Sequence, residues 1–133
     1  MSAHRQFISS GSAWEASAGY SRAVVEGNLV FVSGTIGFDP VAGRLPEGAE
    51  AQARQSLAII DRALRQADAT LMDVTRVVVY VPDRADVPAV SAVLKEKLGA
   101  ARPANTTVCA ALRVEGARVE IEVTAVRTPP PTY

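Results

Sequence analysis

The sequence predicts an α+β domain in which two helices cover one face of a mixed β-sheet. The predicted elements run in the order strand, strand, long loop, helix, strand, helix, strand, strand. Helical segments carry apolar residues at a 3.6-residue period, and the last strand alternates strictly between apolar and polar residues. The length of 133 residues suits one domain, expected at 1–133 with a leading segment at 1–18 and a Pro-rich tail at 128–133.

Two apolar, β-branched runs at 21–26 and 29–33 predict a β-hairpin. They flank a Gly-Asn pair at 27–28, and both residue types tolerate the positive φ of a two-residue turn. A short edge strand is expected before the hairpin at 5–9. Gly and Pro punctuate residues 34–48, which predicts a long loop.

Two helices are predicted, with a strand between them. The first spans 49–67, and the second runs from an N-cap at Asp86 to Leu98, with Gly99 ending it. The strand at 74–81 is so rich in valine that we expect burial on both of its faces. The apolar stripe of the first helix consists of Ala53, Leu57, Ile60, Leu64 and Ala67.

The C-terminal part predicts strands at 103–112 and 119–126, with a turn around 115–116. By alternation, Glu120 and Glu122 share one face of the last strand, opposite its apolar residues. Two acidic residues on a strand face are usually solvated. The alternative is that Glu120 lines a cleft and positions a water molecule or a proton.

One sheet face lacks a predicted cover. Two helices cover only one face of a sheet, and the chain offers little else to cover the second. Self-association through the sheet is therefore expected.

Composition excludes several classes of function. Lys plus Arg and Asp plus Glu both number 14, so no overall positive charge favours nucleic acid as a partner. One cysteine (Cys109) and one histidine (His4) allow no intrachain disulfide and no structural zinc site, so no metal is expected. No apolar run approaches membrane-spanning length and no signal peptide is evident, so no membrane and a cytoplasmic location are expected.

Four blocks of sequence resemble the RidA (YjgF) family. They are Ala-Gly-Tyr-Ser-Arg-Ala-Val at 18–24, Gly-Asn-Leu-Val-Phe-Val-Ser-Gly-Thr-Ile at 27–36, Arg-Pro-Ala-Asn-Thr-Thr-Val at 102–108 and Val-Glu-Ile-Glu at 119–122. The resemblance implies a chorismate-mutase-like fold and a homotrimer whose sheets form a central barrel, with small-molecule clefts between subunits. It also implies hydrolysis of reactive enamines and imines to a 2-oxo acid and ammonia, without a cofactor.

The resemblance assigns candidate site residues. Glu120 matches the glutamate that positions the hydrolytic water, and Tyr20 matches a tyrosine of the cleft. Ser33 and Gly34 match the segment that borders the cleft, and Thr106 stands in the block that binds substrate.

Asn105 departs from the family pattern. The family has an arginine there, whose planar guanidinium binds the substrate carboxylate through two parallel hydrogen bonds. Asn105 has no charge and can only hydrogen-bond a neutral carbonyl or amide. Low activity on imines of simple amino acids, such as 2-aminoacrylate, is therefore expected.

Three residues have two interpretations each. Arg22 is an exposed hairpin residue or supplies a displaced positive charge, and Trp14 packs or roofs the cleft. Cys109 is expected to be a small buried apolar residue, because a nucleophile would need a nearby base. Gly19, where the family usually has proline, is expected to loosen the segment before Tyr20.

Two functions follow from these residues. The first is an enzyme that hydrolyses an enamine or imine other than 2-aminoacrylate. The alternative is a non-enzymatic trimer that binds a small metabolite as a sensor or accessory protein. A ribonuclease is disfavoured, because one histidine cannot form the acid–base pair that cleaves RNA.

Overall fold

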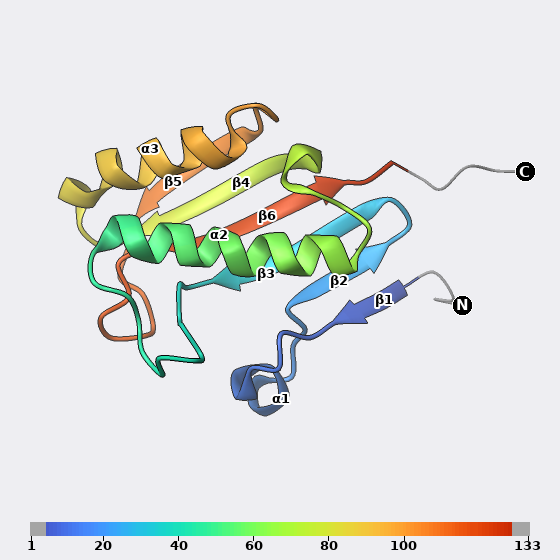
Figure 1. Ribbon diagram of the computed structural model, residues 1–133, viewed down its shortest axis with the longest axis horizontal. Helices are drawn as coiled ribbons and strands as arrows, with labels where there is room; N and C mark the ends of the chain where they lie inside the picture. Colours follow the sequence, from blue (N-terminus) through green and yellow to red (C-terminus); the bar gives the residue numbers. More distant parts are fainter. Residues whose placement is uncertain (1–4, 129–133) are drawn as a thin grey trace, which may run out of the picture.

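The computed structural model describes residues 5–128 and contains one six-stranded sheet with three helices (Figure 1). The sheet order is β1-β2-β3-β6-β4-β5, and every neighbouring pair is antiparallel except β4 and β5. The elements are β1 (Arg5–Ile8), α1 (Ala13–Ala18), β2 (Ala23–Glu26), β3 (Leu29–Thr35), α2 (Ala49–Gln66), β4 (Val74–Val81), α3 (Val87–Leu98), β5 (Ala104–Cys109) and β6 (Glu120–Val126), with 3₁₀ turns η1 (Leu71–Asp73) and η2 (Arg84–Asp86).

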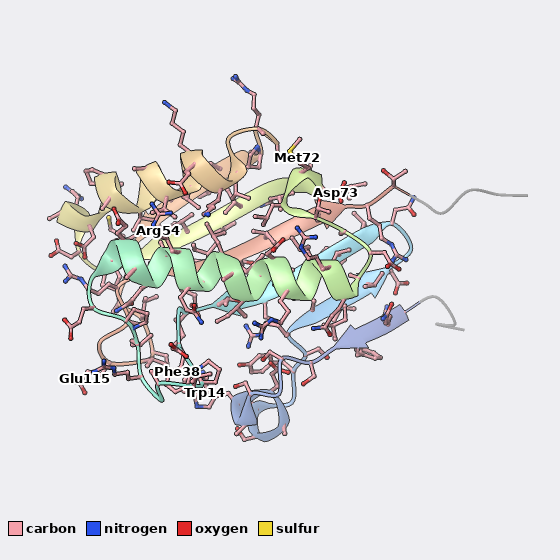
Figure 2. All side chains as sticks on the ribbon, viewed as in Figure 1. Trp14, Phe38, Arg54, Met72, Asp73 and Glu115 are labelled. Carbon is pink, nitrogen blue, oxygen red and sulfur yellow. The ribbon has the colours of Figure 1, made fainter. Side chains whose placement is uncertain are left out.

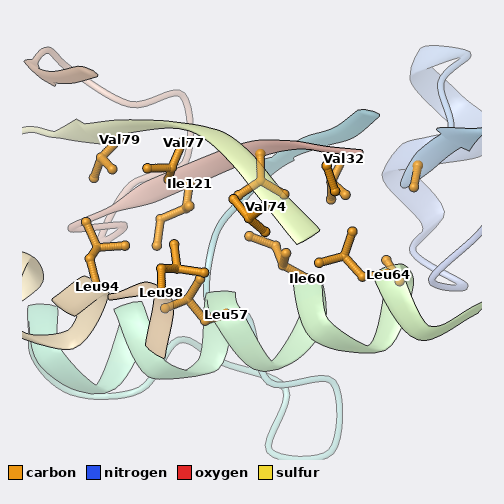
Figure 3. Packing of buried hydrophobic residues seen from close by; sticks show 14 of the residues in the cluster. Val32, Leu57, Ile60, Leu64, Val74, Val77, Val79, Leu94, Leu98 and Ile121 are labelled. Carbon is orange, nitrogen blue, oxygen red and sulfur yellow. The ribbon is translucent and has the colours of Figure 1, made fainter. Parts of the chain in front are cut away.

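The core lies between the sheet and the two long helices, as the sequence predicts. Figure 3 shows α2 and α3 presenting leucine and isoleucine side chains to the valines of the central strands. Ile60 and Leu64 of α2 and Ile121 of β6 are fully buried. Burying a side chain of this size contributes about 1.5–3 kcal/mol, so this layer is the main source of stability.

The opposite face of the sheet is uncovered within the described residues. Phe7, Val24 and Phe31 lie in one row across β1, β2 and β3. Phe7 is 66% exposed and Phe31 is 45% exposed. The predicted burial of β4 on both faces is therefore wrong for the single chain, because α2 and α3 both pack on the same side of the sheet.

The short helix α1 was not predicted. Ser12 begins it by accepting a hydrogen bond from the backbone N–H of Trp14. Gly19 ends it with φ of 75°, a left-handed conformation that proline cannot adopt. The expectation that Gly19 loosens this segment is therefore wrong, because its N–H donates to the carbonyl of Glu15.

Both ends of α3 differ in detail from the prediction. Asp86 precedes the helix, but its side chain makes no cap and instead pairs with Arg118 at 2.7 Å. Gly99 ends α3 with helical backbone angles, and the left-handed residue that redirects the chain is Arg102, with φ of 52°. The boundaries nevertheless agree with the predicted 86–98 helix.

The strand predicted at 103–112 is shorter, and all six residues of β5 are exposed. Cys109 is exposed too, so its predicted burial is wrong. Among the described strands β5 is the edge strand beside β4, and its side chains on both faces are exposed. His4 and the predicted tail beyond Thr128 fall outside the described residues.

Candidate active site

A cavity of about 650 Å³ lies between α1, the loop after β3, α2 and the start of β6. A second hollow of about 500 Å³ on the open side of the sheet shares Tyr20, Gly34, Arg113 and Glu120 with it. Both volumes fall in the range typical of small-molecule sites. Trp14 and Arg22 line the larger space, and Ser33 lines the smaller one.

Glu120 lies where the two hollows meet. It is the first residue of β6 and pairs with Tyr80 of β4. Burial raises the pKa of its carboxyl group, the guanidinium groups of Arg113 and Arg22 partly oppose this effect, and Glu122 adds to it. A half-buried carboxyl group with a raised pKa is a candidate general base, and the cleft interpretation of Glu120 fits this placement.

Gly34 makes room for Glu120. A Cβ atom added at Gly34 would lie 3.0 Å from the carboxyl carbon of Glu120 and 3.2 Å from one of its oxygens. The register between β3 and β6 also shifts between Val32 and Thr35, next to this contact. A bulge of this kind re-aims side chains at a site.

Glu122 is occupied by a hydrogen bond. Tyr80 donates its hydroxyl proton to Glu122 at 2.7 Å, and this bond raises the pKa of Tyr80. Glu122 is half-buried, so neither acidic residue of β6 is a freely solvated side chain. Glu120 accepts no hydrogen bond from residues 5–128, and its oxygens are left for a ligand or water.

Arg22 is buried, which contradicts its interpretation as an exposed hairpin residue. Only 6% of it is exposed. Its Nε donates to Glu15 at 3.3 Å, and one terminal nitrogen donates to the Gly34 carbonyl at 2.9 Å and the Thr35 hydroxyl at 3.0 Å. The other terminal nitrogen donates to the Tyr20 hydroxyl at 3.3 Å. Arg22 therefore fixes Tyr20 and the backbone at Gly34.

Glu15 is the buried counter-ion of Arg22. Burial alone would raise the pKa of Glu15, but hydrogen bonds from Ser10 and Ser9 and the charge of Arg22 outweigh it, so the pKa lies below its usual value. Ser9 Oγ donates at 2.9 Å, and both the hydroxyl and the backbone N–H of Ser10 donate as well. This network ties α1 and the preceding loop to the hairpin.

Trp14 forms an aromatic wall of the larger cavity. Its ring lies 6.0 Å from the ring of Phe38, with a tilt of 58° (Figure 2). The guanidinium group of Arg113 lies over the ring of Trp14, with its carbon atom 5.8 Å from the ring centre. Trp14 is 37% exposed, so its placement at the cavity fits a roof better than simple core packing.

Asn105 and Thr106 do not reach this site in their own chain. Asn105 pairs with Val77, whereas Glu120 lies across from Tyr80, so the residues are separated both across and along the sheet. Neither residue lines either hollow. Asn105 accepts a hydrogen bond from Thr107 at 2.9 Å, as expected for two residues on one strand face.

Gln52 fixes the bases of the two loops that border the cavity. It is buried at the start of α2. Its side-chain nitrogen donates to the carbonyls of Pro46 at 3.0 Å and Gly116 at 3.1 Å, and its oxygen accepts from the Arg118 N–H at 2.7 Å. One amide thereby joins the loop after β3 to the turn before β6.

Sequence reasoning missed Glu15, Phe38 and Arg113. A lone acidic residue in a stretch of Ser and Ala was the available signal for Glu15. Phe38 and Arg113 lie in loops, where no periodicity marks a side chain that faces a cavity. Their contacts are visible only once the chain is folded.

Two kinds of feature are not found between residues 5 and 128. No three His, Cys, Asp or Glu side chains gather closely enough to hold a metal ion. No helix in this part of the chain has the length and apolar character needed to cross a membrane.

Comparison with known proteins identifies the family. The family model described as Endoribonuclease L-PSP, which covers the YjgF/RidA proteins, matches residues 10–127. The chain belongs to the RidA/YjgF family. RidA-family relatives include the 2-iminobutanoate/2-iminopropanoate deaminase of Capra hircus, 35% identical over 94% of this chain and 92% of that protein.

Solved structures agree with this assignment. A member of the YjgF/YER057c/UK114 family from Mycobacterium tuberculosis is 41% identical, with a TM-score of 0.83 over 92% of this chain and 98% of its own. RidA from an Antarctic Psychrobacter is 32% identical, with a TM-score of 0.77 over 90% and 93%. The predicted α+β fold and family are thus confirmed.

Proposed function

We propose that this protein hydrolyses the C=N bond of a small imine, or of an enamine that tautomerises to one, in clefts of a cytoplasmic homotrimer. The observation that carries the proposal is the half-buried Glu120, which lies beside Tyr20 and Gly34 in a cavity of substrate size. Relatives at 32–35% identity are named 2-iminobutanoate/2-iminopropanoate deaminase, which favours an enzyme over a non-enzymatic binding protein.

Glu120 would act as a proton carrier. As the oxygen of water bonds to the imine carbon, the carboxylate takes a proton from that water and passes it to nitrogen, which has gained the C=N π electrons. The carboxylate then takes the hydroxyl proton of the carbinolamine and delivers it to nitrogen. The C–N bond breaks, C=O forms and ammonia leaves. The raised pKa of Glu120 suits both halves of this cycle.

A second subunit would complete the cleft. The open sheet face exposes Phe7 and Phe31, an apolar surface that a further copy of the chain could bury. Asn105 and Thr106 project from an exposed edge strand away from the cavity of their own chain. In a homotrimer they would approach the Glu120 of a neighbouring subunit, which gives each cleft residues from two chains.

A coupled stopped-flow assay tests the reaction. An amino-acid oxidase generates imines in the presence of semicarbazide, and the protein suppresses semicarbazone by hydrolysing the imine first. We expect suppression with bulky imines and little with 2-aminoacrylate. Glu120→Gln should reduce the rate about 10²–10⁴-fold, whereas Glu115→Gln, an exposed carboxyl in the nearby turn, should not.

Two outcomes would contradict the proposal. One is suppression by Glu120→Gln equal to that of the wild type. The other is no hydrolysis of any imine by a protein that still binds 2-oxo acids, which would leave the non-enzymatic binding protein as the function. Gain of activity on 2-aminoacrylate by Asn105→Arg would support Asn105 as the cause of the altered preference.

A further inference from the structure

A 2-imino carboxylate substrate, such as those in the names of the relatives, would need a group that recognises an anion, and Asn105 cannot supply it. A neutral amide forms no ion pair with a carboxylate. Three arginines line the larger cavity, namely Arg22, Arg62 and Arg113. The question is which of them is free to bind a ligand.

Arg22 is not free. Its Nε and one terminal nitrogen are fully used by Glu15, Gly34 and Thr35, and the other terminal nitrogen donates to Tyr20. Glu15 also neutralises its charge at 3.3 Å. No pair of adjacent N–H groups remains for a carboxylate to accept, so Arg22 holds the site together and does not recognise an anion.

Arg113 has the opposite character. Its guanidinium forms no hydrogen bond or ion pair with any side chain or carbonyl in the described range 5–128. It lines both hollows together with Glu120, whose pKa its charge lowers, and its guanidinium carbon lies 5.8 Å from the centre of the Trp14 ring. A ring beneath a guanidinium orients it without using its N–H donors.

Arg62 is also exposed and lines the larger cavity, but it comes from α2 and does not line the second hollow beside Glu120. It is not among the charges that act on Glu120. It therefore serves as a matched control, because it is also an unpaired arginine of the same cavity within the described residues.

We propose that Arg113, held over Trp14, binds the carboxylate of the substrate from the same chain that supplies Glu120. The substrate class is then a 2-imino carboxylate with a large apolar or planar side chain, because Trp14 and Phe38 form an aromatic wall in a cavity of about 650 Å³. The identity of the reaction rests on the proposed function, whereas the anion-binding role does not.

Binding of an unreactive probe tests the inference directly. Trp14 is the only tryptophan, so its fluorescence reports binding at the site. Wild-type protein should bind benzoate more tightly than the neutral benzamide. Arg113→Gln should lower the affinity for benzoate on the order of tenfold or more, because it removes a charge-assisted pair of hydrogen bonds. Benzamide affinity should change little, and Arg62→Gln should leave benzoate affinity unchanged.

Calorimetry repeats the titration without relying on the Trp14 environment, and the melting temperature verifies that the variants fold. Three results would overturn the inference: no benzoate binding by wild type at millimolar concentration, equal affinity of Arg113→Gln and wild type, or a loss at Arg62→Gln in place of Arg113→Gln. If Arg113 proves necessary for benzoate while no imine is hydrolysed, the anion site stands and the proposed deaminase activity falls. If Arg113→Gln still hydrolyses the imine with an unchanged KM, the proposed deaminase activity stands and the anion-binding role of Arg113 falls.

Discussion

Two walls of the cavity use arginine in contrasting ways. On one wall Arg22 is buried, and its nitrogens are hydrogen-bonded to Glu15, Tyr20, Thr35 and the chain at Gly34. On the other wall Arg113 is exposed, lies over the ring of Trp14 and has no hydrogen bond or ion pair to any of residues 5–128. The contrast teaches that a buried, paired charge sets geometry, whereas an exposed, unpaired one remains available for a ligand.

The largest effect is expected from breaking the buried wall. Glu15→Gln leaves Arg22 buried without its counter-ion, which should cost about 3–5 kcal/mol of unfolding free energy. Urea unfolding at pH 7 measures this loss. Arg5→Gln, which breaks an exposed ion pair with Glu26 at 2.8 Å, should cost far less, because solvent screens that pair.

The pH dependence of stability sharpens the same prediction. The pKa of Glu15 is lowered in the folded state, so its stabilising contribution is complete above the unfolded pKa of about 4.5 and is lost as pH falls through the folded value. Wild type and Glu15→Gln should therefore converge in stability toward low pH. An equal difference between them at pH 7 and pH 3 would contradict this account.

The next effect concerns the backbone that Arg22 holds. In Gly34→Ala the new methyl group would lie 3.0 Å from the Glu120 carboxyl carbon and displace that group. Misplacement by a fraction of an ångström to one ångström should lower the rate of imine hydrolysis by roughly 10–100-fold. The semicarbazone assay measures the rate, and an unchanged circular dichroism spectrum separates this effect from unfolding.

A smaller effect is expected from the aromatic part of the exposed wall. Trp14→Ala removes the ring under Arg113 and should weaken benzoate binding by about 1 kcal/mol, measured by calorimetry. Trp14→Phe should retain most of the affinity because a ring remains. Equal losses in both variants would indicate that the indole, rather than a generic aromatic face, is needed.

The smallest effect is a shift in the pH profile. The positive charge of Arg113 lowers the pKa of Glu120 against the raising effect of burial. In Arg113→Gln that pKa should rise further, so the acid limb of the rate profile should move to higher pH, because hydrolysis needs the ionised form. Arg62→Gln should leave the limb in place, and a shift to lower pH in Arg113→Gln would contradict the assignment.

Local patterns in the sequence predict most of the fold. The hairpin, both long helices and the face of Glu120 follow from turn residues and periodicity, which depend on neighbours in the chain. The burial of Arg22 and exposure of Cys109 were not predictable in this way. Arg22 is buried because α1, distant from Gly34 in sequence, folds back with Glu15, and Cys109 is exposed because β5 happens to be the sheet edge.

The part of the site that lies on strands could be predicted, because local sequence patterns predict strands but not the paths of loops. Tyr20, Gly34 and Glu120 stand in strands or beside them, so their convergence follows from strand pairing. Arg113 and Phe38 lie in loops whose paths depend on tertiary contacts. The family resemblance assigns both Asn105 and Glu120 to the site, yet within one chain β4 separates their strands in the folded sheet.

Gln52 has a consequence for how this protein could diversify. Its amide joins the base of the loop after β3 to the base of the turn before β6. The tips of these segments stay exposed, with Val41 at 96% and Glu115 also at the surface. Exchanges at such tips usually alter stability by no more than about 0.5 kcal/mol. New ligand preferences could therefore accumulate there one residue at a time, while a single buried amide preserves the frame around Glu120.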